Sequence, residues 1–80
     1  MKPVSPDQIR AVMLGIPSWT KILPLIRDDT LFEDSGIDSL ALLELVSELQ
    51  TLSGLEIPDD DVERISTIAG IVRYLNERGE

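Results

Sequence analysis

The clearest helical pattern in the chain is at residues 38–54, which read DSLALLELVSELQTLSG. From Ser39 to about Ser53 the stretch holds good helix formers and no breaker, and Gly54 suits a C-terminal cap. Apolar residues recur there with helical spacing, which predicts a core-facing stripe of Leu42, Leu45, Val46 and Leu49. We therefore expect one long amphipathic helix, against which the other segments pack.

A second face of this predicted helix carries Leu40, Leu43 and Ser47, together with Glu44. The two leucines lie outside the core-facing stripe and within about one helical turn of Ser39. They either widen the buried arc of the helix or form an exposed apolar spot beside the serine. Spacing alone does not decide between these two interpretations.

The N-terminal region has the same periodicity but is interrupted. Ser5 or Pro6 can begin a helix there. Pro17 disfavours helical geometry at the preceding residue and Gly15 lies beside it, so we expect a kink or a short break near Pro17. Pro24 is expected to end this region. The predicted buried face consists of Ile9, Val12, Met13, Ile16, Trp19, Ile22 and Leu23.

Residues 25–38 are predicted to form a long loop between these helices, because turn-forming residues cluster in it. Leu31, Phe32 and Ile37 could attach this loop to the core. A loop of this length in so small a domain is unusual unless it contributes to function.

The C-terminal part predicts a short helix followed by a longer one. Pro58 or Asp59 can begin one or two helical turns through Ile65, and Ser66 or Thr67 can cap the last helix. The inward-facing positions of that last helix are Ile68, Ile71, Val72 and Leu75. The sequence thus predicts an all-α fold: a four-helix bundle of three long helices and one short one, in a single domain over residues 1–80.

The composition limits the classes of function. Fifteen acidic residues against seven basic ones give a net charge of −8, which argues against nucleic-acid binding and favours partners with basic docking patches. The sequence contains neither cysteine nor histidine, so disulfides, a zinc site, a thiolate nucleophile and a histidine base are not available. We expect no catalytic residue, no metal ligand and no enzymatic activity.

The sequence also bears on the setting in which the protein works. No apolar run approaches the ~20 residues of a membrane span, so we expect no membrane insertion. The first residues lack the apolar segment of a signal peptide. The expectation is a cytoplasmic monomer.

Short motifs lie at both ends of the long predicted helix. Gly36-Ile37-Asp38-Ser39-Leu40 leads into it, Glu56-Ile57-Pro58-Asp59-Asp60 follows it, and Ile65-Ser66-Thr67-Ile68 leads into the last helix. With these motifs in this order, the chain from roughly Asp29 onward resembles the acyl carrier protein family. The first motif is similar to the family's phosphopantetheine attachment motif, and the second is similar to its third-helix signature.

The resemblance implies an acyl carrier protein in which Ser39 bears a 4′-phosphopantetheine arm, moved from coenzyme A by a phosphopantetheinyl transferase. Asp38 would flank the attachment site and take part in transferase recognition. The residues themselves agree, because a serine at a helix start without a nearby base is a poor catalyst but a good acceptor. Backbone amides and the helix dipole would favour the phosphodiester there. The thiol of the arm would hold the acyl group as a thioester.

Partner enzymes are expected to dock beside Ser39. Leu40 and Leu43 would supply an apolar spot, and acyl-loading and acyl-processing enzymes would bring basic patches to an acidic rim. The expected rim and its neighbours are Glu44, Ser47, Glu48, Ile57, Asp59 and Glu63. Asp60 and Asp61 are interpreted as ordinary solvated acids.

Three alternatives remain open for the cargo and the function. Departures from the family pattern favour polyketide or another secondary-metabolite synthesis over fatty-acid synthesis; they are Ser35, Gln50, Thr51 and Ser53. An aminoacyl or peptidyl carrier is the nearest alternative, although Ile37-Asp38 before the serine is more similar to the acyl class. The alternative of a different class is a small acidic helical interaction module with no prosthetic group.

Overall fold

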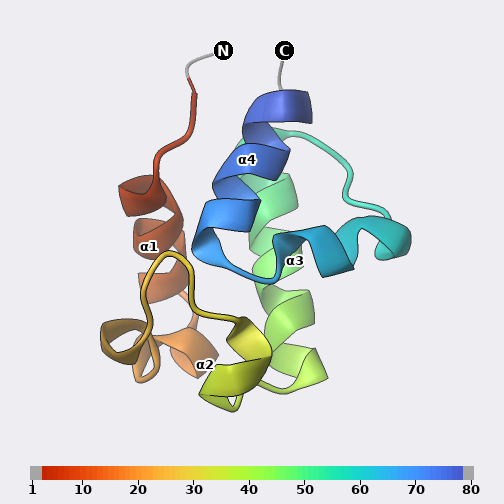
Figure 1. Ribbon diagram of the computed structural model, residues 1–80. Coiled ribbons are helices and arrows are strands. Elements are labelled where there is room, and N and C mark those ends of the chain that lie inside the picture. Colours follow the sequence, from red (N-terminus) through yellow and green to blue (C-terminus); the bar gives the residue numbers. More distant parts are fainter. Residues whose placement is uncertain (1–2, 79–80) are drawn as a thin grey trace.

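The computed structural model describes residues 3–78, and in that range it contains helices and no strand (Figure 1). The elements are α1 (Pro6–Leu14), α2 (Pro17–Thr20), η1 (Leu23–Leu25), η2 (Phe32–Ser35), α3 (Ser39–Ser53), η3 (Asp59–Ile65) and α4 (Ile68–Arg78), where η denotes a 3₁₀ helix. α1, α3 and α4 run lengthwise, and η3 crosses beside them. The predicted all-α bundle is confirmed, with η3 as its short helix. Within residues 3–78 no helix combines the length and apolarity needed to cross a bilayer.

α1 begins with a capping box and ends at a genuine break. The Ser5 amide donates to Gln8 Oε1 at 2.8 Å, and the Gln8 amide donates to Ser5 Oγ at 3.4 Å. α1 ends at Leu14, Gly15 follows as its C-cap in the right-handed region, and Ile16 is extended with φ −111° and ψ 109°. α2 then begins at Pro17. The extended Ile16 confirms the predicted break. Its cause is the ring of Pro17, which disfavours helical geometry at the residue before it.

The connection from α2 to α3 is more ordered than the sequence indicates. Pro24 does not end the helical region but lies inside η1, where a residue in the first turn needs no amide donor. η2 interrupts the loop predicted at residues 25–38. Both expectations were wrong because periodicity does not identify single helical turns.

This connection is held against the rest of the molecule by backbone hydrogen bonds. The Ala69 amide donates to the Asp28 carbonyl at 2.8 Å, and the Phe32 amide donates to the Ser66 carbonyl at 2.9 Å. Phe32 is buried, whereas Leu31 is exposed and does not attach the loop to the core as expected. The backbone therefore fixes the loop to the start of α4, while the buried Phe32 and the half-buried Ile37 attach it to the core as expected.

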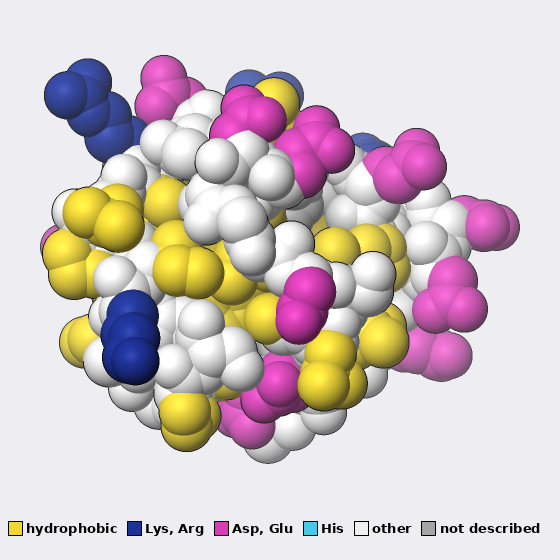
Figure 2. Space-filling view, turned by 90° about the horizontal axis from the view of Figure 1, so that it is seen from below, with side chains coloured by type: hydrophobic (Ala, Val, Ile, Leu, Met, Phe, Trp, Pro, Cys, Tyr) yellow, Lys and Arg dark blue, Asp and Glu magenta, His cyan; other side chains and the backbone are white. Residues whose placement is uncertain are grey.

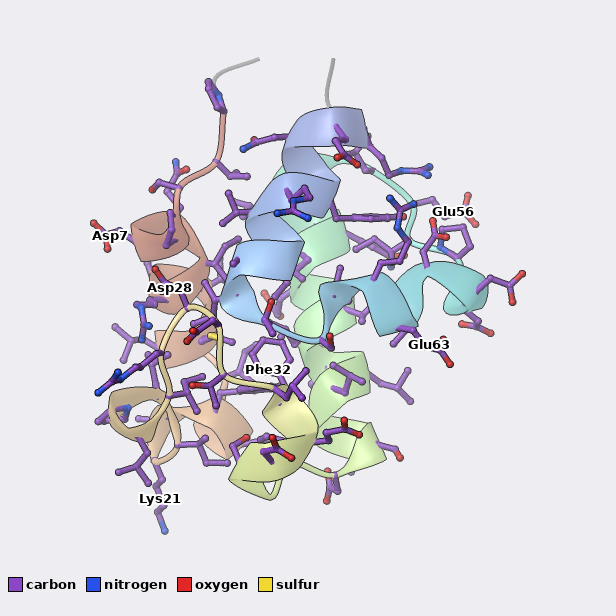
Figure 3. The ribbon with its side chains drawn as sticks, viewed as in Figure 1. Asp7, Lys21, Asp28, Phe32, Glu56 and Glu63 are labelled. Carbon is purple, nitrogen blue, oxygen red and sulfur yellow. The ribbon has the colours of Figure 1, made fainter. Side chains whose placement is uncertain are left out.

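Trp19 joins α2 to α3 and η2 in the core. Its indole Nε1 donates to the Ala41 carbonyl of α3 at 2.9 Å. Its ring meets Phe32 edge-on, with the ring centroids 4.9 Å apart. Phe32 points from η2 into the interior (Figure 3). The aromatic pair thus holds α2 and η2 together next to the start of α3.

The predicted stripes of α3 and α4 are confirmed. In α3, Leu45, Val46 and Leu49 are buried and Leu42 is half-buried; in α4, Ile68, Ile71 and Leu75 are buried and Val72 is half-buried. Gly54 ends α3 in the left-handed conformation at φ 70°, as a glycine cap does. Thr67 caps α4, since its Oγ1 accepts the Gly70 amide at 2.8 Å. Tyr74 is a further buried residue that the sequence did not indicate.

Candidate functional site

Ser39 is the first residue of α3 and is exposed. The chain reaches it through a tight turn in which Gly36 has φ 84°, a left-handed conformation that glycine adopts without strain. Ser35 Oγ donates to the Phe32 carbonyl at 2.6 Å and closes the short helix η2 before this turn. Phe32 thus anchors η2 in the core, and Ser39, which follows the turn after η2, lies at the surface.

Asp38 is the N-cap of α3. Its backbone is extended, with φ −90° and ψ 174°, and its Oδ1 accepts the Ala41 amide at 2.8 Å. The amides of Ser39 and Leu40 are among those that an α-helix leaves without an intrahelical acceptor. They remain at the positive end of a 15-residue helix, where an anion next to Ser39 is stabilised.

These surroundings fit a serine that is modified rather than a serine that catalyses. The chain has no histidine or cysteine. Within residues 3–78 no group of three or more His, Cys, Asp or Glu side chains could hold a metal ion. Ser39 therefore has no histidine or cysteine near it that could act as a base of the usual kind. An exposed hydroxyl at an open helix N-terminus suits a phosphodiester.

The two leucines of the second face of α3 do not widen the buried arc. Leu40 is 67% exposed and Leu43 is 56% exposed, although both lie on the helix that supplies much of the core. The end of the molecule at which α3 begins presents hydrophobic side chains interspersed with acidic ones (Figure 2). The structure thus selects the second interpretation of the sequence, an exposed apolar spot beside Ser39.

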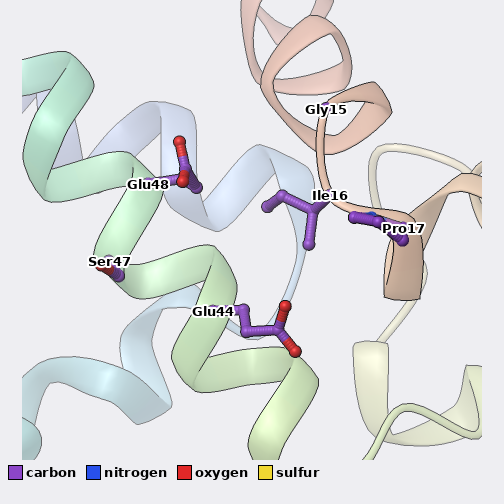
Figure 4. Close-up of a pocket in the computed structure, with 6 residues that line it drawn as sticks. All are labelled: Gly15, Ile16, Pro17, Glu44, Ser47 and Glu48. Atoms are coloured by element: carbon purple, nitrogen blue, oxygen red, sulfur yellow. The ribbon is translucent and has the colours of Figure 1, made fainter.

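The acids of α3 face the break between α1 and α2. Glu44 is half-buried, and its Oε1 accepts a hydrogen bond from Ser18 Oγ at 3.2 Å. Glu44 and Glu48 line one wall of a cavity of about 280 Å³, and residues 15–17 line the other (Figure 4). Ser47, exposed on the same helix, also borders it. Sequence reasoning missed the contribution of residues 15–18, because it treated the break only as a feature of the fold.

The remaining predicted acids lie on η3. Asp59 begins this helix and Glu63 lies one turn later, and both are exposed. Glu63 borders a second, more apolar cavity of about 380 Å³ between η2, α3 and η3. That cavity reaches Leu42, which is three residues beyond Ser39 on α3. The structure therefore brings Glu63 next to the helix that carries Ser39.

Ile57 does not belong to this exposed surface, and its inclusion requires correction. Its side chain is only 5% exposed and packs in the core. Its amide donates to Gln50 Oε1 at 2.8 Å, which turns the segment after α3 inward. A segment without periodicity gives no indication of which side chains face the core, so the sequence could not place Ile57.

Asp61 also differs from expectation, because it is not simply solvated. The Tyr74 hydroxyl donates to Asp61 Oδ2 at 2.5 Å, and Arg78 lies 3.5 Å from the same oxygen. Burial raises the pKa of Tyr74 above its ordinary value of 10.0, and the hydrogen bond to Asp61 raises it further. Asp60, in contrast, is exposed as expected.

Comparison with known proteins agrees with this arrangement. The chain matches the family described as phosphopantetheine attachment site over residues 14–75, which include Ser39. The acyl carrier protein of Chloroherpeton thalassium is 41% identical over 54 residues, covering 66% of this chain and 68% of that protein. The acyl carrier protein of Zymomonas mobilis is 40% identical over 53 residues, covering 66% and 68%. That of Wolinella succinogenes is 41% identical over 51 residues, covering 62% and 67%.

The matched family accounts for the features of the site without any catalytic group. Its defining property is a covalently bound 4′-phosphopantetheine, so the alternative of an interaction module without a prosthetic group is not supported. The chain belongs to the acyl carrier protein family, whose members are carriers and not enzymes.

Proposed function

We propose that Ser39 bears the 4′-phosphopantetheine arm and that the chain carries acyl groups on it between enzymes. The observation that supports this most directly is the exposed hydroxyl at the positive end of α3. As the Ser39 oxygen forms the phosphodiester, the phosphoanhydride bond of coenzyme A breaks and adenosine 3′,5′-bisphosphate leaves. The phosphopantetheinyl transferase takes up the Ser39 proton, because this chain lacks a histidine or cysteine base. Asp38 caps α3 and, as the residue before Ser39, takes part in recognition by the transferase. The bound arm supplies a thiol that holds the acyl group as a thioester.

The proposed docking surface combines exposed leucines with carboxylates, and we call it the Ser39 face. It consists of Ser39, Leu40, Leu43, Glu44, Ser47, Glu48, Asp59 and Glu63. The leucines lose their contact with water when a partner docks, and the carboxylates attract basic patches. Association is therefore fast and sensitive to salt. Acyl-loading and acyl-processing enzymes use this face one after another.

Leu43→Ser tests this docking surface, with Leu25→Ser as the matched control. Both side chains are exposed leucines, but Leu25 lies in η1, outside the Ser39 face. Leu43→Ser is expected to lower the transferase kcat/KM by about tenfold, as truncation of a docking residue does. Leu25→Ser should leave it unchanged. Equal effects of the two substitutions would show that the Ser39 face has no special role in docking.

We further propose that the cargo is an acyl intermediate of fatty-acid, polyketide or related secondary-metabolite synthesis, with an aminoacyl cargo as the alternative. The names of the relatives and the pair Ile37-Asp38 support the acyl cargo. Residues 1–80 would act as one monomeric carrier domain in the cytoplasm, where coenzyme A supplies the arm. Loading the arm-bearing protein with acyl and with aminoacyl donors, read by intact mass, decides the cargo class. Loading by aminoacyl donors alone would replace the acyl proposal.

A further inference from the structure

Three of the basic residues of the chain lie apart from the Ser39 face. Between Asp28 and Glu63 the sequence has twelve acidic residues and no lysine or arginine. Directly after this stretch come Arg64, Arg73 and Arg78, which are three of the seven basic residues of the chain. All three are exposed, on the end of η3 and along α4. α4 runs toward the end of the molecule opposite the start of α3 (Figure 1).

A small cavity lies between these arginines. It measures about 160 Å³ and is lined by Arg64, Gly70, Arg73, Tyr74 and Glu77. Gly70 allows the close approach that forms it, because a Cβ there would lie 2.8 Å from the Arg64 carbonyl and 3.0 Å from Thr67 Oγ1. The end of η3 can therefore pack directly on α4. We call the lining residues and Arg78 the arginine face.

Two guanidinium groups of this face are held in place by Tyr74 and by ion pairs at the surface, and the third, that of Arg73, is exposed. Arg64 and Arg78 each lie 5.4 Å from the centroid of the buried Tyr74 ring, and Arg78 also pairs with Asp61 at 3.5 Å, so one guanidinium nitrogen of Arg78 is already engaged. Arg64 pairs with Glu77 at 3.4 Å, and both side chains are more than half exposed. Such an exposed pair is weak and exchanges readily with another carboxylate. Within residues 3–78 Arg73 has no ion pair.

We propose that the arginine face docks an acidic segment of a partner protein, separately from the Ser39 face. Carboxylates of that segment pair with Arg73 and displace Glu77 from Arg64, and the planar guanidinium groups bind them through two hydrogen bonds each. The net charge of −8 repels long polyanions such as nucleic acid and anionic bilayers. At an ionic strength of about 0.15 M this repulsion is screened beyond about 8 Å, so a short segment responds mainly to the charges nearest to it. The two faces differ in charge and in place, so one partner can hold the carrier while another enzyme acts at Ser39.

The test is a titration of the isotope-labelled chain, without the arm, by a hexaglutamate peptide at an ionic strength of about 0.15 M, followed by amide chemical shifts. Shifts are expected at Arg64, Gly70, Arg73 and Glu77. Arg73→Gln is expected to weaken binding by about tenfold, the contribution of a charge-assisted pair. Glu77→Gln should strengthen binding, because it removes the competing carboxylate. Arg27→Gln, an exposed arginine outside this face, is the matched control and should bind as the parent does.

Several outcomes overturn the proposal. Absence of shifts at millimolar peptide does so, as does equal binding by the Arg73→Gln variant with an unchanged fold. Shifts that appear on concentrating the protein alone identify a second copy of this chain as the occupant. Identical shifts with inorganic phosphate at matched ionic strength identify a general anion site instead. None of these readouts depends on Ser39 or on the arm, so their failure is distinguishable from failure of the proposed carrier function.

Discussion

Replacing Trp19 with phenylalanine is expected to destabilise the fold although an aromatic ring is retained. Trp19 is 0% exposed, and its Nε1 donates to the Ala41 carbonyl at 2.9 Å. Losing this hydrogen bond costs about 1 kcal/mol. The lost apolar atoms and the cavity they leave cost about 1–2 kcal/mol more. The sum of about 2–3 kcal/mol is a large part of the roughly 4–12 kcal/mol expected for a chain of this length.

Urea unfolding followed by far-ultraviolet circular dichroism measures this effect in a variant that has lost its only tryptophan. The unfolding midpoint should fall while the slope is unchanged, and the Tm should drop by about 10–20 °C. Leu25→Ala is the matched control, because it removes apolar volume from a side chain that is 81% exposed and should change stability by less than about 0.5 kcal/mol. A Trp19→Phe effect as small as that of the control would refute the reasoning that this indole joins α2 to α3.

Three further predictions concern capping, pH and salt. Asp38→Ala should lower the free energy of unfolding by about 1 kcal/mol through loss of the bond to the Ala41 amide, while Asp38→Asn retains the cap; equal losses in urea titrations would contradict this. Because the pKa of Tyr74 is raised in the folded state, the unfolded chain binds fewer protons above pH 10.0, so the free energy of unfolding should fall as pH rises from there. Tyr74 is the only tyrosine, and its tyrosinate absorbance should titrate above 10.0 in the folded chain; a midpoint at or below that value would count against the burial of Tyr74 and its bond to Asp61. Added NaCl or Mg²⁺ should raise the Tm, because screening relieves the self-repulsion of a chain with net charge −8, and a Tm independent of both would show that this repulsion is unimportant.

The parts of the fold that follow from local chemistry could be predicted. Helical spacing determines which side chains of α1, α3 and α4 share a face, and Ile9, Leu45 and Ile71 are fully buried as that spacing requires. The break at Pro17 follows from the stereochemistry of the residue before a proline. The cap at Gly54 follows from the left-handed conformation that only glycine adopts easily.

The parts set by contacts between distant residues could not be predicted. Tyr74 and Asp61 are 13 positions apart, and neither residue alone indicates that the hydroxyl and the carboxylate meet. The Ile57 amide donates to the side chain of Gln50, and Ile57 is buried although its segment has no periodicity. In the candidate site, the spacing of Leu40 and Leu43 separated them from the core stripe, but only the packed structure determined that both are exposed.

The central claim is that Ser39 is the attachment residue, and intact mass tests it most directly. The chain is incubated with coenzyme A, Mg²⁺ and a promiscuous phosphopantetheinyl transferase, alongside Ser39→Ala and the matched control Ser47→Ala, which alters an exposed serine of the same helix. The account predicts a gain of one phosphopantetheine in the parent and in Ser47→Ala, and no gain in Ser39→Ala. A gain that persists in Ser39→Ala, or no gain in a folded parent, would contradict it.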